Sequence, residues 1–242
     1  SMWSLQRVLY YEKDDLKKVT SILQKLVTHY PKWTYWKQLG GMYGSQERET
    51  DQLVATEMVY MNDQLTTESQ VMSMAYMYLG AEVPYRAARI IEKGMKDDII
   101  EKTAKNLEVL GSAWWQAKNL ESALKAFENA SKYSDTGEIQ SRIASIYLDL
   151  GKDKQAYKAS QKAAKKGEVK NASTNYATMG SALINLHCYK DAVKAFNQSV
   201  KTAKTKKAKR YPAQWIKFAN AEGSRLQKLR DVGATVPGCS KA

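Results

Sequence analysis

Hydrophobic and polar residues follow one another along this chain with the period of an α-helix. Leu107, Leu110 and Trp114 fall three and four residues apart, which places them on one face of a helix. A second run with the same period, over residues 123–130, predicts another helix directly afterwards. Trp115 lies about 100° around the first helix from Trp114. We therefore predict that this helix has two faces with different roles, one in a core and one lining an open groove.

The same pattern of apolar and small residues recurs along the chain every 33 to 36 residues. In each copy a small residue stands where two helices would approach closely, and larger apolar residues flank it. A copy at the N-terminus begins with Trp3 and Tyr10. In the second copy, Gln52 stands where the second helix should carry a small residue, so we expect that helix to be degenerate. The small residues of the first helices in the later copies are Gly40, Ala75, Gly111, Ala144 and Gly180.

Residues 36–43 indicate which type of repeat this is. They read WKQLGGMY, which resembles the W-x₂-L-G-x₂-Y opening of a tetratricopeptide repeat (TPR), a helix–turn–helix unit of about 34 residues. We therefore predict an all-α TPR superhelix, an α-solenoid of about six helix pairs plus a C-terminal capping helix.

The capping helix is expected from about Pro212, with Trp215, Ile216 and Phe218 covering the last apolar face of the array. Residues 1–230 are predicted to form a single array with this cap, and residues 231–242 a flexible tail.

The concave face of such an array is the predicted partner-binding groove. Aromatic and Met side chains with sparse charges are typical of a surface that binds an extended or helical peptide. An incidental packing role remains the alternative for Trp115. A Lys-and-Asn clamp for a chaperone's C-terminal carboxylate is not expected, because Gly41 rather than Asn lies one turn after Lys37. The predicted groove residues are Tyr11, Lys37, Met72, Tyr76, Glu108, Trp115, Arg142, Leu148 and Ile184.

The charge of the chain is concentrated in its second half. The net charge is +13, and residues 151–242 hold 20 basic side chains against five acidic ones. This basic half is either a solvated face or a surface for an acidic partner or a membrane. Nucleic acid is disfavoured, because lysine outnumbers arginine and no aromatic residues are interleaved with the lysine run.

No constellation of catalytic or metal-binding residues is visible. The two histidines, His29 and His187, lie in different repeats, and no hydrolase, nucleotide-binding or zinc motif occurs. We expect no enzymatic activity, no cofactor and no metal site. Cys188 and Cys239 are too few for a disulfide framework, so both thiols are expected to stay free.

Two stretches resemble one bacterial family. Residues 83–114, VPYRAARIIEKGMKDDIIEKTAKNLEVLGSAW, and residues 211–218, YPAQWIKF, are similar to TPR proteins described as components of the TonB energy-transduction system. The resemblance covers most of the chain from about residue 30. It implies a periplasmic scaffold beside TonB, ExbB or ExbD in the uptake of iron-carrying ligands, with its signal peptide already removed. The rival hypotheses are a general adaptor, cytoplasmic or periplasmic, and a subunit of an envelope-assembly complex unrelated to TonB.

Overall fold

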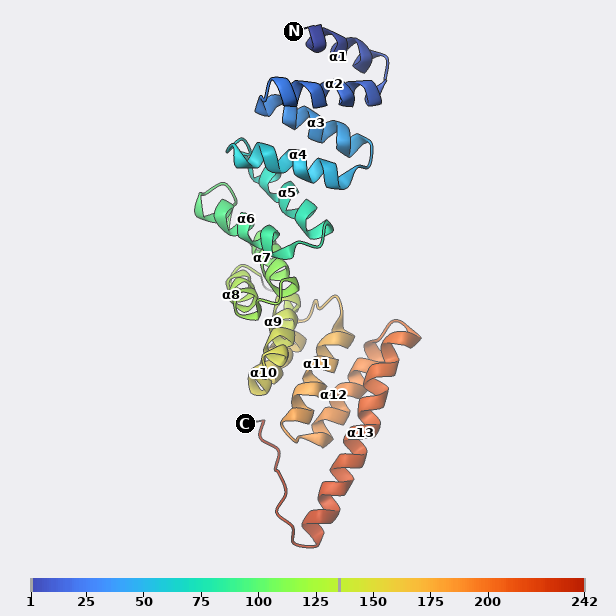
Figure 1. The fold of residues 1–242 in the computed structure, drawn as a ribbon. Coiled ribbons are helices and arrows are strands. Elements are labelled where there is room, and N and C mark those ends of the chain that lie inside the picture. The colour runs from blue at the N-terminus through green and yellow to red at the C-terminus, as the bar shows by residue number, and fades with distance from the viewer. Residues whose placement is uncertain (1, 135, 242) are drawn as a thin grey trace. The chain divides into compact units, whose positions relative to one another are not determined.

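A computed structural model of the chain describes residues 2–134 and 136–241, so Ser1 and the last residue of the predicted tail, Ala242, lie outside the described residues. The described residues form thirteen α-helices and no strand, which confirms the all-α helical repeat (Figure 1). The chain divides into two compact units, residues 1–102 and 103–242.

Unit 1 contains the helices α1 (Met2–Glu12), α2 (Leu16–His29), α3 (Trp33–Ser45), α4 (Glu49–Met61), α5 (Glu68–Gly80) and α6 (Pro84–Lys96). Unit 2 contains α7 (Ala104–Gln116), α8 (Leu120–Ala130), α9 (Gly137–Asp149), α10 (Asp153–Lys166), α11 (Ala172–Asn185), α12 (Tyr189–Thr202) and α13 (Lys206–Asp231). Within each unit, every helix packs on the next one along the chain.

The turn inside each helix pair contains one residue with a left-handed backbone. Such a residue ends a helix by turning the chain away from the helix axis. Because every pair has such a residue in its turn, the chain changes direction in a similar way before the second helix of each pair. The six residues are Asp14, Glu47, Glu82, Lys118, Gly151 and His187.

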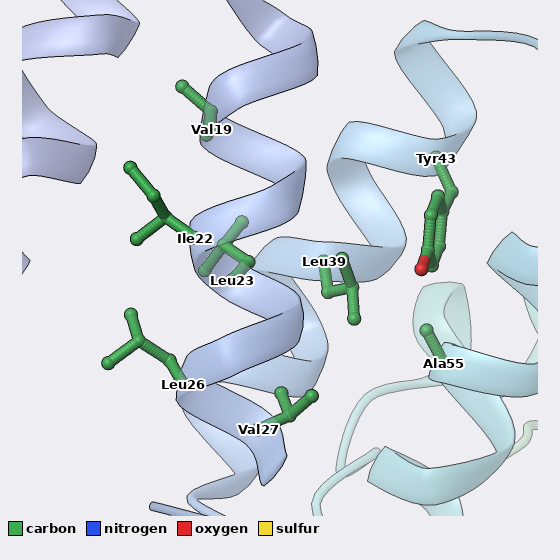
Figure 2. Close-up of a cluster of buried hydrophobic side chains, with 8 residues drawn as sticks. All are labelled: Val19, Ile22, Leu23, Leu26, Val27, Leu39, Tyr43 and Ala55. Atoms are coloured by element: carbon green, nitrogen blue, oxygen red, sulfur yellow. The ribbon is translucent and has the colours of Figure 1, made fainter. Parts of the chain in front are cut away.

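One hydrophobic cluster in unit 1 is built from buried side chains of α2, α3 and α4 (Figure 2). Leu23 and Leu26 of α2 are fully buried, with Leu26 on the side of α2 away from α3, where Leu39 and Tyr43 belong to the same cluster. The Tyr43 hydroxyl accepts a hydrogen bond of 2.9 Å from Gln24 Nε2, so the polar end of this core residue is satisfied. The regularly spaced apolar residues of the sequence thus form the contacts between successive helices.

The small positions of the repeat differ in how tightly they are packed. A Cβ atom added at Gly111 would lie 2.8 Å from the ring of Phe127, and one at Gly180 would lie 2.7 Å from Phe196. At Gly40 the nearest atoms would be at 3.5 Å, an ordinary contact. The helix expected to be degenerate, α4, has 13 residues like α3 and α5, and the Gln52 side chain lies beside Gly44.

The last helix begins six residues before the predicted start. Thr205 caps it, its hydroxyl accepting a hydrogen bond of 3.1 Å from the Ala208 N–H, and Pro212 lies in its second turn. The helix continues through this proline, which has no N–H to bond the Ala208 carbonyl. Trp215 stacks on Phe196 of α12 with ring centroids 6.2 Å apart, which fits the predicted capping role.

The prediction of two free thiols is wrong, because Cys188 and Cys239 form a disulfide. After α13 the chain reverses at Gly233, whose φ of +82° suits glycine. The tail then returns to the turn between α11 and α12 (Figure 1), where the Ser240 N–H donates a hydrogen bond of 3.0 Å to the Leu186 carbonyl. The fold of this tail brings together two cysteines that are 51 residues apart in sequence.

Candidate functional site

The first helix of each pair carries the residues predicted to line a groove. In unit 1, Tyr11 on α1 is 61% exposed and Tyr76 on α5 is 47% exposed, and Lys37 on α3 is also exposed. Met72 is only 7% exposed, so very little of its side-chain surface is available for contact with a partner. Binding by these four residues stays a prediction.

A cavity of about 380 Å³ lies beside Tyr11, between α1, α2 and α3. Its wall is mainly apolar, and a Cβ atom added at Gly41 would meet no other atom within 4 Å. The absence of a side chain at Gly41 therefore keeps this space open. The lining residues are Arg7, Val8, Tyr11, Val19, Leu23, Gln38, Gly41 and Met42.

One positive charge stands in the wall of this cavity. The Arg7 guanidinium donates a hydrogen bond from Nη1 to Gln38 Oε1. Its Nε–H is buried and has no hydrogen-bond partner among the described residues. A buried donor without an acceptor is unfavourable, and no ligand in the cavity can reach this nitrogen in the structure as it stands. The cavity thus combines a mainly apolar wall with one guanidinium group.

In unit 2, the adjacent tryptophans of α7 occupy different environments, as the sequence predicts. Trp114 is 3% exposed in the core, whereas Trp115 is partly exposed. Trp115 Nε1 donates a hydrogen bond of 3.1 Å to the carboxylate of Asp149 on α9. This bond holds the indole in place on the surface of the two helices.

Arg142 contacts both α7 and α9, which makes it a bridging residue as well as a candidate binding residue. Its Nη1 donates to Ser112 Oγ at 3.2 Å, its Nη2 pairs with Glu138 at 3.4 Å, and the guanidinium lies over the ring of Phe127. Of the other candidates, Glu108 and Leu148 are partly exposed. Ile184 is 8% exposed and belongs to the α11–α12–α13 core.

The basic half of the chain carries most of its lysines and arginines on α10, α12 and α13. Lys158, Lys162 and Lys165 of α10 are exposed, and none of them forms an ion pair within the described residues. Their positive charge therefore faces solvent.

Within residues 2–134 and 136–241, no three or more His, Cys, Asp or Glu side chains gather in a way that could hold a metal ion. In the same residues, no helix combines the length and apolar character needed to cross a bilayer.

Arg7, Gln38 and Met42 line the cavity but were not singled out as binding residues from the sequence. Arg7 lies one helical turn before Tyr11, and Met42 follows the Gly41 that the missing clamp had drawn attention to. A search for side chains one turn from each predicted groove residue would have found Arg7. Gln38 and Met42 belong to the cavity because of how α1 and α3 pack.

Comparison with known proteins identifies the fold. No protein-family model matches the sequence, and no curated protein matches it. Among solved structures, MamA is 17% identical, with 70% of this chain and 91% of MamA covered and a TM-score of 0.58. YrrB, described as a TPR protein with an unusual peptide-binding site, is 10% identical, with coverages of 79% and 97% and a TM-score of 0.59. Cut9, in its complex with Hcn1, is 12% identical over 90% of this chain and 42% of its own, with a TM-score of 0.52. The chain has the fold of TPR arrays.

Proposed function

We propose that this protein is a non-enzymatic interaction scaffold that binds a partner peptide through the cavity between α1 and α3. The observation that carries the proposal is the apolar cavity of about 380 Å³ beside the exposed Tyr11. Such a space accommodates one large side chain of a peptide, and burial of that side chain would supply most of the binding free energy. Arg7, which lines the same cavity, supplies a positive charge beside the bound peptide. YrrB, which is described as having an unusual peptide-binding site, supports the same proposal by analogy.

The finer proposal places the scaffold in the periplasm, beside TonB, ExbB or ExbD. It rests on the resemblance of residues 83–114 and 211–218 to TPR proteins of that system. The Cys188–Cys239 disulfide adds support for an exported protein, because disulfides form and persist in oxidising compartments. A general adaptor, or a subunit of an envelope-assembly complex, is the alternative if the TonB components do not bind.

The test is a titration of the purified periplasmic segment of TonB against three versions of the protein. Gly41→Leu places a side chain inside the cavity, whereas Gly80→Leu adds the same group at an exposed site on α5 where a Cβ also meets nothing within 4 Å. We expect wild type and Gly80→Leu to bind alike, and Gly41→Leu to bind roughly tenfold more weakly or worse.

Equal binding by both variants would contradict the cavity as the binding site. Failure of wild type to bind TonB, ExbB or ExbD segments would contradict the finer proposal. A peptide selected from a displayed library would then test the scaffold function with the same two variants.

A further inference from the structure

Unit 2 contains a second and larger cavity, of about 960 Å³, that the α1–α3 site does not involve. It lies between the start of α12 and the second half of α13, and it reaches Cys239 in the tail. The two helices meet at Gly223, where an added Cβ would lie 3.3 Å from Tyr189 Cβ. The α13 residues that line the cavity lie on both sides of this contact, from Ala219 to Arg230.

The tail closes one side of this space, and residues 233–241 are called the strap here. The Cys188–Cys239 disulfide makes α12, α13 and the strap into one covalent ring. Three further contacts hold the strap: Ser240 N–H to the Leu186 carbonyl, Lys241 to the Asp191 carboxylate, and Arg230 Nη2 to the Pro237 carbonyl at 3.0 Å. The cavity therefore has a fixed wall on its tail side.

The charges around the cavity favour an anion. Lys190, Lys194 and Arg230 line it, and Asp191 is the one carboxylate among the lining residues. Asp191 is already engaged by Lys194 at 3.2 Å and by Lys241. The hydrogen bond from Lys241 holds the pKa of the Asp191 carboxyl below its usual value. Because Lys241 already supplies one positive charge for this carboxylate, Lys194 can pair with a ligand as well. Lys190 forms no ion pair within the described residues, which leaves its charge for a ligand.

The remainder of the wall is apolar, with Val193, Ala219 and Leu226 lining it. A ligand for this site needs negative charge and an aliphatic group together. A membrane surface is too flat to enter a space between two helices and a strap. Nucleic acid would bring a phosphate backbone but no aliphatic group for this wall. An acidic protein segment meets both requirements.

We propose that the cavity between α12, α13 and the strap is a second binding site, for a partner segment that carries carboxylates around an aliphatic side chain. The carboxylates pair with Lys190 and Lys194, and the aliphatic side chain packs on Val193 and Leu226. The disulfide keeps the strap in the position that completes the site.

The probe is a fluorescein-labelled peptide of four glutamates around two leucines, followed by fluorescence anisotropy. The test variant is Lys190→Gln/Lys194→Gln. The control is Lys162→Gln/Lys165→Gln, which removes the same charge from the exposed face of α10. We expect the test variant to bind roughly tenfold more weakly than wild type, because two close charge pairs are lost, and the control to stay within about twofold. Cys239→Ser, which removes the covalent attachment of the strap, is expected to weaken binding as well.

Several results would overturn the proposal. Equal weakening by the test and control variants would show diffuse attraction to the basic half. Equal affinity for a peptide of four lysines around two leucines would remove the charge requirement. Displacement of the probe by an oligothymidine would point to nucleic acid instead, and unchanged binding by Cys239→Ser would show that the disulfide does not complete the site.

Discussion

Trp114 and Trp115 are adjacent in sequence, but their side chains lie in different environments. Trp114 lies in the core, while Trp115 is partly exposed and bonded to Asp149. The repeat register predicts this difference, because it assigns a large core residue to position 114 and the next position to the open face. The contribution of Trp115 to partner binding stays a prediction.

Alanine at each tryptophan should therefore have different consequences. Trp114→Ala leaves a large cavity and is expected to reduce the free energy of unfolding by about 3–5 kcal/mol. Trp115→Ala loses one surface hydrogen bond and should cost about 1 kcal/mol. Denaturant unfolding curves of both variants measure this. Equal destabilisation by the two substitutions would refute the assignment of the two faces.

Tyr78 on α5 gives a prediction that depends on pH. Burial, and then its hydrogen bond of 2.7 Å to Glu57, raise the pKa of the Tyr78 hydroxyl to about 12. In the unfolded chain this hydroxyl ionises near pH 10, so its contribution to stability is complete below that pH and is lost as the pH rises towards 12. The stability advantage of wild type over Tyr78→Phe should therefore shrink between pH 10 and pH 12. Denaturation of both proteins across this range is the measurement, and a constant difference would show that Tyr78 ionises normally.

At the scale of helices, the close approach inside each pair depends on what faces the small residue. Gly111 faces the Phe127 ring, whereas Gly40 faces Ala55 and Thr56 with room for a methyl group. Gly111→Ala is expected to destabilise the protein by about 1–3 kcal/mol through overpacking. Gly40→Ala should be neutral, or stabilising by up to about 1 kcal/mol because alanine favours the helix. Thermal unfolding of the two variants measures this difference. A loss of stability in Gly40→Ala as large as that in Gly111→Ala would contradict the packing described.

The sequence predicted the helix pairs because the small and large positions of the repeat recur at a nearly constant spacing. It did not predict the α1–α3 cavity, since Arg7, Gln38 and Met42 form no motif and meet only through the packing of two helices. The start of α13 was misplaced because Pro212 suggested a helix beginning, while Thr205 supplies the cap. The disulfide was missed because the reversal at Gly233 brings Cys239 to Cys188.

At the scale of the whole molecule, the disulfide ties the end of the chain to the body of unit 2. Cross-linking two residues 51 apart restricts the unfolded chain, so Cys239→Ser should lower the free energy of unfolding by about 2–4 kcal/mol. Hydrogen exchange under native conditions should place the loss in unit 2 and leave amides of α2 and α3 unchanged. Wild-type protein with two free thiols under denaturing, non-reducing conditions would contradict the disulfide itself.

The binding of a partner in the α1–α3 cavity is tested most directly by NMR of the methionine methyl groups. Met42 lines the cavity, whereas Met74 is fully buried in α5 and Met61 is exposed at the end of α4, so the two serve as internal controls. During titration with the periplasmic segment of TonB, we expect the Met42 signal to move in a saturable way while those of Met61 and Met74 stay in place. An unmoved Met42 signal would contradict binding in this cavity.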